Sequence, residues 1–195
     1  VNYFLWDKNH SDLCEVTSIR GDEKITIKRK LNEYDIFIRN NLSIELIQRL
    51  MNSSDKKMDS IVYSRNVFGI VSSEHGTINK NNPDDLILIS SQKGNSLGSS
   101  YISKNKITKN EDIINKYKVI IGKVVPRNGE VGVDPKIGYR AITTVHIVTP
   151  GHVFTETYLL LSVFDTLEES ENFAKYMTCK FPRFLLHETY SSMNI

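Results

Sequence analysis

The stretch TPGHVFTETYLLLSVFDTLEESENFAKYMTCKFPRFLL, residues 149–186, carries the most ordered pattern in the chain. Within it, the apolar run TYLLLSVF at 157–164 is typical of a buried strand. Thr166 follows as a helix N-cap, and LEESENFAKYMTCK at 167–180 predicts an amphipathic helix. The inner face of that helix is formed by Leu167, Ser170, Phe173, Ala174 and Met177. No residue pattern here is typical of catalysis, so the stretch predicts a structural module.

The N-terminal region predicts antiparallel strands. In KITIKRK, residues 24–30, Ile25 and Ile27 fall on one face and the intervening polar side chains on the other. Gly21 and Asp22 form the turn that precedes this strand. Together with strands predicted at 2–6, 14–19 and 35–40, the pattern indicates a meander over residues 1–40.

The middle of the chain alternates strand and helix signals. Ser43 is typical of an N-cap for a helix over IELIQRLMN, residues 44–52. Buried-type strands are predicted at 86–90 and 117–125, another late strand at 143–149, a short helix near 111–115, and loops at 91–100 and 126–140; residues 60–73 mix strand and turn signals. Runs of strands broken by isolated helices indicate the α+β class, with mixed, mainly antiparallel sheets.

Composition excludes several classes of protein. The 195 residues are 39% hydrophobic and 25% charged, with a net charge of +2, which is ordinary for one substantial domain or two small ones. No apolar run approaches the roughly 20 residues of a membrane span, so no membrane partner is expected. Cys14 and Cys179 lack both zinc-site spacing and the density of a disulfide scaffold, and we interpret them as reduced thiols of a cytoplasmic protein. The chain opens at Val1 inside a strand-like run, which suggests a piece of a longer polypeptide.

Motifs for common chemistries are missing. Neither GxxxxGK[ST] nor a GxGxxG after a strand is present, and the five histidines lack metal-ligand spacing, so no metal site is predicted. One pattern resembles a catalytic motif: Asp12, Asp22 and Lys24 match the D…DxK arrangement of magnesium-dependent nucleases. Two polar hairpin tips explain the same three residues.

Several blocks of the chain resemble the γ-type N6-adenine DNA methyltransferases of restriction–modification and phage-defence systems. VNYFLWDK at 1–8 resembles the GGVxYFLWD segment that closes the catalytic domain of that family. The later blocks RKLNEYDIFIRNN, YSRNVFGI, YKVIIGKVV and FTETYLLLSVFDTLEESENFAKYMTCKFPRFLL follow in the family order. The resemblance covers essentially the whole chain, and its C-terminal part is similar to the TaqI-like specificity domain.

The resemblance implies a role in recognition rather than in catalysis. The Asn/Asp-Pro-Pro-Tyr/Phe motif that holds the flipped adenine is absent, since no two prolines are adjacent, and so is the glycine-rich site for S-adenosylmethionine. Both are expected upstream of Val1, so no catalytic residue and no cofactor are assigned to this chain, and S-adenosylmethionine is implied only for the parent. Residues 1–40 then correspond to the end of the methyltransferase domain and residues 41–195 to the target-recognition domain.

The implied partners are double-stranded DNA and the upstream methyltransferase domain of the same polypeptide. Phosphates attract Lys and Arg, whereas planar Arg and Asn side chains recognise base edges. We therefore expect Arg65 and Asn66 at bases and phosphate or groove contacts from Lys28, Arg29, Lys30, Lys123, Arg127, Lys136 and Arg140.

Alternatives stay open at this point. Arg65 could instead be a structural residue that pairs with an acid and holds the sheet. The whole chain could be a protein–protein interaction module of a restriction or defence complex, or the nuclease already named. Whether the parent enzyme also cleaves DNA does not follow from the sequence.

Overall fold

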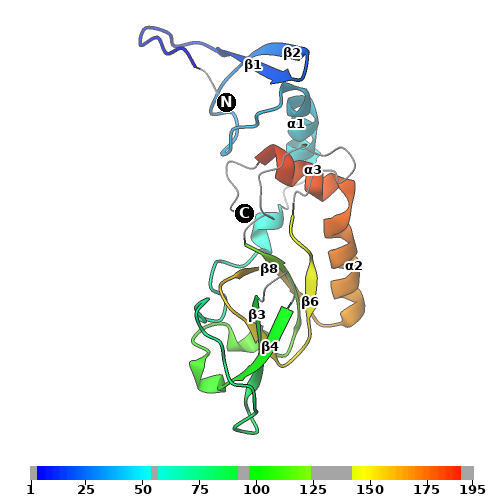
Figure 1. Ribbon diagram of the computed structural model, residues 1–195. Helices are drawn as coiled ribbons and strands as arrows, with labels where there is room; N and C mark the ends of the chain where they lie inside the picture. Colours follow the sequence, from blue (N-terminus) through cyan, green and yellow to red (C-terminus); the bar gives the residue numbers. More distant parts are fainter. Residues whose placement is uncertain (1–3, 54–56, 92–96, 124–141, 190–195) are drawn as a thin grey trace. The chain divides into compact units, whose positions relative to one another are not determined.

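The structure is a computed structural model that describes residues 4–53, 57–91, 97–123 and 142–189 (Figure 1). The chain divides into two compact units, Val1–Asp55 and Lys56–Ile195, which we call the N-terminal and C-terminal units. Both helices and strands are present, and the fold class is α+β as predicted. The structural division falls after the helix at 44–53, whereas the sequence suggested a functional boundary at residue 40; that functional boundary stays a prediction.

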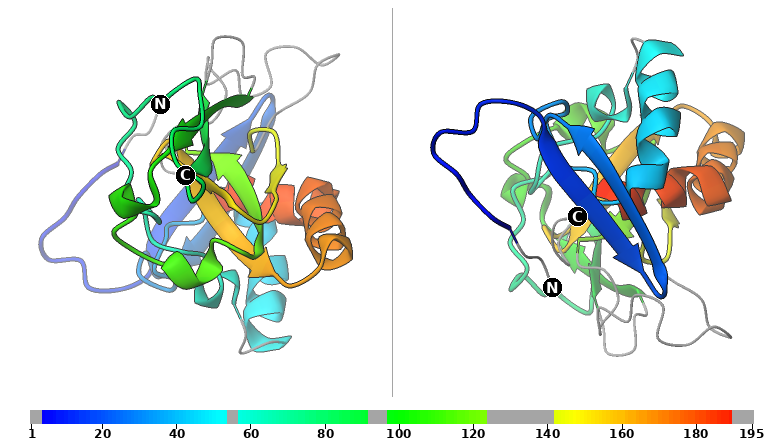
Figure 2. Two further views of the ribbon diagram at one scale, coloured as in Figure 1. Left: turned by 90° about the horizontal axis from the view of Figure 1, so that it is seen from below. Right: turned by 90° about the horizontal axis from the view of Figure 1, so that it is seen from above.

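A β-hairpin forms the body of the N-terminal unit. Strands β1 (Cys14–Arg20) and β2 (Glu23–Arg29) form an antiparallel hairpin (Figure 2), in which Val16 lies opposite Ile27. Gly21 opens the two-residue turn with a φ of +58°, a conformation that glycine adopts without steric cost. The predicted strands at 14–19 and 24–30 are thus confirmed.

Two other strand predictions in this unit are wrong. Residues 35–40 are not extended against a neighbour, because their carbonyl groups serve side chains of the hairpin: Ile38 O accepts from Arg29 and Arg39 O accepts from Ser18. In the described part of the predicted strand at 2–6, Phe4–Trp6 has no strand partner. A strand needs a neighbour for its main-chain groups, and local propensity does not supply one.

The predicted helix of this unit is confirmed as α1 (Ile44–Ser53), but its cap is not Ser43. A short 3-10 helix, η1 (Asn41–Ser43), leads directly into α1. Asn40 caps this pair, because its side-chain oxygen accepts a hydrogen bond from Leu42 N.

The C-terminal unit contains two three-stranded sheets. The first has the order β4-β3-β7 and the second β6-β5-β8, and every pair is antiparallel except β3 with β7. The bounds are β3 (Leu86–Ser91), β4 (Leu97–Ile102), β5 (Tyr117–Gly122), β6 (His146–Val148), β7 (His152–Phe154) and β8 (Tyr158–Phe164). Short 3-10 turns lie between them at η2 (Met58–Ser60), η3 (Lys104–Lys106) and η4 (Glu111–Ile113).

Strands β5 and β8 are buried on both faces. On one face, Ile120 and Leu160 join a core that also contains Leu88 of β3 and Phe154 of β7. On the other face, neighbouring residues of the same strands pack with Met177 of the long helix α2 (Leu167–Thr178). The order of layers is therefore sheet, sheet and helix, which explains the continuous apolar runs VII and LLL in the sequence.

Two helices form the end of the C-terminal unit, of which the first was predicted from the sequence and the second was not. Thr166 and Glu169 cap α2 reciprocally, in the capping-box arrangement. Ser170 and Met177 are buried on its inner face as predicted, whereas Leu167 is 45% exposed. A further helix, α3 (Lys180–Thr189), was not predicted, and Pro182 is tolerated because it lies in the first turn.

Other differences follow from long-range pairing. Residues 97–100 belong to β4 rather than to a loop, because β3 supplies a partner from Leu86 to Ser91. Strand β7 was missed, and residues 60–73 form turns with no strand. The predicted loop at 126–140 lies outside the described residues.

Lys118 of β5 is fully buried in this unit. Its ammonium lies 2.6 Å from Lys116 O, 2.8 Å from Ile114 O and 3.4 Å from both Ile113 O and Thr149 O. Four carbonyl oxygens thus surround one buried charge and join the turn at 113–116 to the turn at 149. Removal from water nevertheless disfavours the charged form, and burial lowers the pKa of Lys118 to about 8 from 10.5.

The buried lysine predicts an alkaline rise in stability. Between pH 8 and 10.5 the unfolded chain still binds the Lys118 proton that the folded chain has released, so unfolding becomes less favourable as the pH rises. Relative to Lys118→Met, the wild-type free energy of unfolding should increase over this window by at most about 3 kcal/mol. Urea unfolding followed by circular dichroism measures it. The exposed control Lys109→Met should run parallel to wild type; equal slopes for all three proteins would contradict the prediction.

Candidate nucleic-acid interface

The nine predicted DNA-contacting residues fall into three groups. Lys28, Arg29 and Lys30 belong to the N-terminal unit, and Arg65, Asn66 and Lys123 to the C-terminal unit. The remaining three, Arg127, Lys136 and Arg140, lie outside the described residues. Each unit is therefore considered by itself.

Lys28 and Lys30 present their side chains to solvent. Lys28 lies on the outer face of the hairpin, opposite Glu15, and Lys24 lies on the same face four residues earlier. A mobile, exposed ammonium suits a phosphate oxygen, which demands charge but little geometry. A phosphate contact by these two residues stays a prediction.

Arg29 has a different environment. It is only 4% exposed, and its Nε lies 2.7 Å from Glu33 Oε1. The guanidinium donates to Ile38 O at 2.8 Å and to Asn41 Oδ1 at 3.4 Å, and it stacks on the Phe37 ring at 4.8 Å. All of these partners belong to the segment after the hairpin, so Arg29 holds that segment against β2 and is not available to a phosphate in this conformation.

Asn41 completes this polar interior. Its amide donates to Val16 O of β1 at 2.8 Å and to Ile25 O of β2 at 2.9 Å. Its main-chain N–H donates to Ser18 Oγ at 3.1 Å. Side-chain hydrogen bonds from one asparagine therefore reach both strands of the hairpin, and the alternation noted in the sequence places Arg29 on this inner side with Ile25 and Ile27.

In the C-terminal unit, Arg65 lies on a segment that is anchored in the core. Phe68 is 0% exposed and packs edge-on against Phe154 with a centroid separation of 5.1 Å. Val67 and Ile70 are buried in the same cluster. Phe68 is thus a core residue, and it fixes the position from which Arg65 projects.

Main-chain hydrogen bonds attach the same segment at both ends. Tyr63 N donates to Leu160 O at 3.0 Å, and Glu156 N donates to Ile70 O at 2.9 Å. The segment at 63–70 therefore runs along the beginning of β8. Two further bonds, Thr108 N to Phe68 O at 3.1 Å and Asn110 Nδ2 to Val67 O at 2.7 Å, hold it from the other side.

The Arg65 side chain itself is exposed. Within the described part of the chain it makes no ion pair and no hydrogen bond. The structural alternative for Arg65 requires an acidic partner, and none is present among these residues. A guanidinium that is free while its backbone is held by core contacts is already placed for a ligand.

Lys123 lies close to the same strand. It follows β5 directly, and its N–H donates to Thr157 O at 3.0 Å, just before β8 begins. The beginning of β8 is thus flanked by the Arg65 segment and by Lys123. Its side chain is half-buried rather than fully extended into solvent.

Asn66 serves the turn rather than a base. Its φ of +56° lies in the left-handed region, and Gly69 closes the turn with a φ of +78° and an N–H that donates to Asn66 O. The Oδ1 atom of Asn66 is buried without a hydrogen-bond partner in the described structure. A bidentate contact with adenine uses both amide atoms, and this one is not accessible.

The two acids of the nuclease alternative lie at polar turns. Asp22 occupies the β1–β2 turn, and Asp12 accepts from Leu13 N, whereas Lys24 is an exposed residue of β2. In the described ranges no group of three His, Cys, Asp or Glu side chains could hold a metal ion. No observation favours cleavage over the hairpin-tip interpretation.

Because Arg29 is buried and Lys28 is exposed, we expect substitutions at these adjacent residues of β2 to differ in their effect on stability. Arg29→Met leaves Glu33 without its opposite charge and leaves Ile38 O and Asn41 Oδ1 without their donor, so it should destabilise the N-terminal unit by about 3 kcal/mol or more. Lys28→Met, on the outer face, should change its stability by less than about 0.5 kcal/mol. Hydrogen exchange of the β1 and β2 amides in the full chain measures both. Equal hydrogen-exchange protection of these amides in the two variants would show that the Arg29 contacts do not stabilise the hairpin.

The left-handed turn predicts a second contrast, at Asn66. Asn66→Gly keeps the backbone conformation without strain and removes an unpartnered oxygen, so the melting temperature should stay the same or rise. Asn66→Ala should cost about 1–2 kcal/mol, because alanine lacks the short polar side chain that lets asparagine adopt the left-handed region more readily than other residues with a Cβ. Calorimetric melting of both variants tests the turn role, and a glycine variant less stable than the alanine variant would contradict it.

Comparison with known proteins assigns no family to this chain. No family model, no curated protein and no solved structure matches this chain. No helix in the described ranges has both the length and the apolar character to cross a membrane. The function must therefore be argued from the sequence resemblance and from the geometry just described.

Proposed function

We propose that this chain is the DNA sequence-recognition part of an adenine-specific N6 DNA methyltransferase from a restriction–modification or defence system. The observation that carries the proposal is the exposed guanidinium of Arg65, which has no partner among the described residues and lies on a segment anchored by Phe68. The sequence resemblance supplies the class of enzyme. Methyl transfer and S-adenosylmethionine are assigned to the methyltransferase domain of the parent polypeptide.

Arg65 is the proposed base contact. The planar fork of arginine donates two hydrogen bonds to O6 and N7 of guanine in the major groove, and such a pair discriminates against other bases. Discrimination improves when the side chain starts from a fixed backbone, because less conformational entropy is lost on binding. The Phe68–Phe154 contact and the main-chain bonds at Tyr63 and Ile70 provide that fixed backbone.

Phosphate contacts are assigned to lysines. The exposed Lys28 and Lys30 carry them in the N-terminal unit, and the half-buried Lys123 carries one in the C-terminal unit. Arg29 and Asn66 are left out, because each is engaged in holding its own segment. Lysine contacts of this kind supply salt-dependent affinity and no sequence information.

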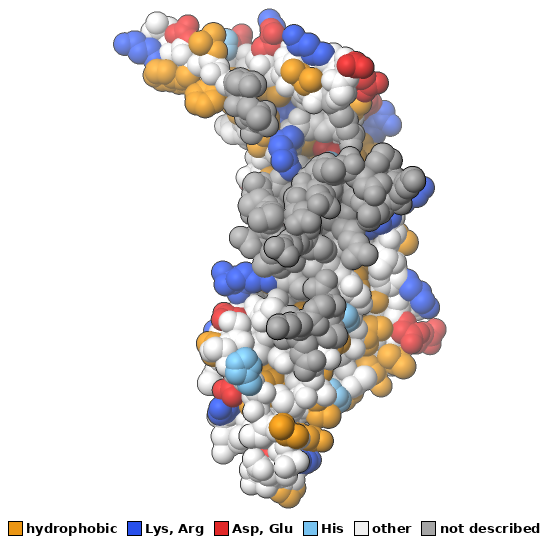
Figure 3. Space-filling model, viewed as in Figure 1, with side chains coloured by type: hydrophobic (Ala, Val, Ile, Leu, Met, Phe, Trp, Pro, Cys, Tyr) orange, Lys and Arg blue, Asp and Glu red, His pale blue; other side chains and the backbone are white. Residues whose placement is uncertain are grey.

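The methyltransferase domain is proposed to cover an apolar segment of the N-terminal unit. Phe4 is 91% exposed, Leu5 99% and Trp6 74%, and hydrophobic side chains are visible on the surface of this unit (Figure 3). Three consecutive large apolar side chains in water are unfavourable by the hydrophobic effect. They belong to the block that resembles the end of the family's catalytic domain.

The same segment favours the second candidate, a protein–protein interaction module. Under that alternative the apolar side chains bind another subunit, and DNA is not the ligand. The two functions differ in what Arg65 does. Sequence-specific DNA binding that depends on Arg65 supports the first, whereas a chain with no DNA affinity in its parent supports the second.

The proposal predicts that Arg65 determines sequence specificity, whereas Lys28 contributes electrostatic affinity for DNA of any sequence. In the parent polypeptide, Arg65→Lys keeps the charge but loses the fork, and should weaken binding to the cognate site by about 1–3 kcal/mol with little effect on unrelated DNA. Lys28→Ala should weaken all sequences alike and lower the slope of log K against log salt by about one. Fluorescence anisotropy with a cognate and a scrambled duplex at several salt concentrations measures both.

Folding of each variant is checked by thermal melting. An Arg65→Lys protein that keeps its full preference for the cognate duplex would exclude the base contact. A loss that is equal on both duplexes would instead assign Arg65 to phosphate.

A further inference from the structure

The β-hairpin of the N-terminal unit has two edges along which main-chain groups have no partner. Arg20 pairs with Glu23 across a two-residue turn, so these two residues exchange both main-chain hydrogen bonds, and such pairs recur at every second position. No hydrogen bond joins the main chain of the residues between these pairs to another described residue. Their N–H and C=O groups point away from the hairpin: Glu15, Thr17 and Ile19 in β1, and Lys24, Thr26 and Lys28 in β2.

The sheets of the C-terminal unit have edges that are occupied or short. The edge strands are β4 and β7 in one sheet and β6 and β8 in the other. Thr77 exchanges two main-chain hydrogen bonds of 2.8 Å with Tyr101 of β4, and Tyr63 N donates to Leu160 O of β8 at 3.0 Å. Other segments of the same unit therefore cover part of these two longer edges.

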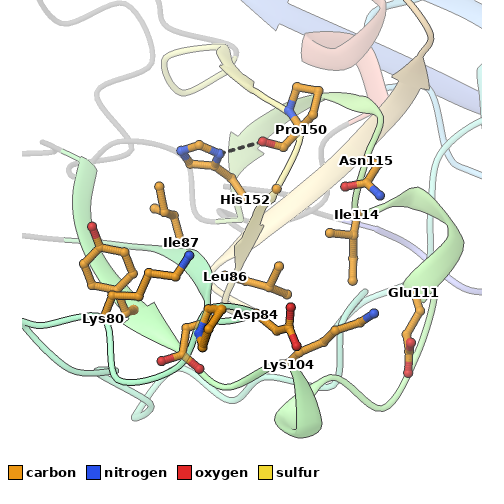
Figure 4. A pocket seen from close by; sticks show the side chains of 14 residues that line it. Lys80, Asp84, Leu86, Ile87, Lys104, Glu111, Ile114, Asn115, Pro150 and His152 are labelled. Atoms are coloured by element: carbon orange, nitrogen blue, oxygen red, sulfur yellow. Dashed lines mark hydrogen bonds between the residues drawn. The ribbon is translucent and has the colours of Figure 1, made fainter.

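Strands β6 and β7 are protected by their length. Each contains only three residues. A turn limits β7 at its start, where His152 Nδ1 lies 3.0 Å from Pro150 O (Figure 4). Very short edge strands are one way in which proteins prevent pairing with another strand. Among the described residues, a seven-residue strand with no main-chain partner along its edge occurs only in the hairpin β1–β2.

The two edges of this hairpin differ in their side chains. Lys24 and Lys28 occupy two of the three edge positions of β2, and Lys30 follows the strand. Lysine on an edge strand opposes pairing, because a further strand would remove water from its charge. In β1 the β-branched residues Thr17 and Ile19 occupy two of the three positions, and Ile19 is 72% exposed. The edge of β1 is therefore the one suited to accept another strand.

The exposed apolar segment Phe4–Trp6 indicates what covers this edge. Seven residues, 7–13, separate it from β1, and a chain of this length spans at most about 25 Å. Asp7 O accepts from His10 N at 3.1 Å, so these residues turn rather than extend fully. A domain that buries Phe4–Trp6 thus comes within reach of β1, and unpaired groups at every second residue match the repeat of a β-strand.

We propose that the edge of β1 accepts a β-strand of the methyltransferase domain, so that the hairpin extends a sheet of that domain. This inference rests on the proposed function, because the partner is the domain assigned there to the parent polypeptide. Main-chain hydrogen bonds of Glu15, Thr17 and Ile19 supply the attachment, as in other cases of strand addition. The lysines of β2 end the extended sheet at its opposite edge. A two-stranded hairpin is marginally stable alone, and a third strand stabilises it.

Thr17 and Thr26 are matched probes of the two edges. They lie directly opposite each other, and their hydroxyl oxygens are 2.9 Å apart. Hydrogen exchange of both amides is measured by mass spectrometry with electron-transfer fragmentation, in the isolated chain and in the parent polypeptide. Both amides should exchange fast in the isolated chain. In the parent, Thr17 should exchange at least about tenfold more slowly while Thr26 stays unchanged, because only Thr17 gains a hydrogen bond.

Proline variants give a second comparison. Proline at an edge-facing position removes no hydrogen bond between β1 and β2, since the N–H that it lacks points outward. Thr17→Pro should therefore abolish the slow exchange of the Glu15 and Ile19 amides in the parent. Thr26→Pro, the matched control on the other edge, should leave that slow exchange intact.

Three outcomes overturn the proposal. The first is an equal rate for Thr17 in the isolated chain and in the parent, and the second is equal slowing of Thr17 and Thr26. The third is slowing of Thr17 in the isolated chain that increases with protein concentration, which would assign the edge to a second copy. Arg65-dependent preference for a cognate duplex is measured separately, so strand addition can fail while the recognition function stands. Slow exchange at Thr17 in a parent without that preference supports strand addition and contradicts the recognition function.

Discussion

The burial of β5 and β8 on both faces is the constraint on which the C-terminal unit depends. Ile120 and Leu160 face the sheet β4-β3-β7, while Val119 and Leu161 face α2. Because both faces are covered, any polar group on these strands must find a partner inside the protein. Lys118 meets that requirement with four carbonyl oxygens, and it does so by drawing the turns at 113–116 and 149 towards the strand.

The Arg65 segment uses this core as its support. It is attached to the core through Phe68 and through hydrogen bonds to the beginning of β8. The carbonyl of Ile114 accepts from both Lys118 and Gly151, so the turn at 113–116 is attached to the same core. The exposed charge of Arg65 therefore projects from a backbone that packing has already fixed, and little entropy remains to be lost on binding.

The sequence predicted the elements whose signals are local. The apolar runs of β5 and β8, the capping box at Thr166 and Glu169, and the hairpin at Gly21 need only neighbouring residues to be recognised. Strand β7 was missed because its three residues form a strand only through parallel pairing with β3, about 65 positions away in the chain. For the site, the period-two pattern of KITIKRK already placed Arg29 on the inner face with Ile27, and extending the alternation by one step would have separated it from Lys28. Nothing in the sequence marks the burial of Lys118, because the carbonyl groups that surround its ammonium come from the turns at 113–116 and 149.

The two units are stabilised by different interactions, and the difference bears on function. The C-terminal unit has an apolar core on both sides of a sheet, whereas Arg29, Asn41 and Ser18 hold the N-terminal unit through hydrogen bonds to backbone carbonyls. Net stabilisation from such bonds is about 1 kcal/mol each, so the hairpin has less apolar burial to draw on. The same unit exposes Phe4, Leu5 and Trp6, the apolar surface that a neighbouring domain would bury. A polar interior combined with an apolar exterior is the pattern of an element that completes another domain, which agrees with the proposal that the N-terminal unit docks on a methyltransferase domain while the C-terminal unit carries its own core and recognises the ligand.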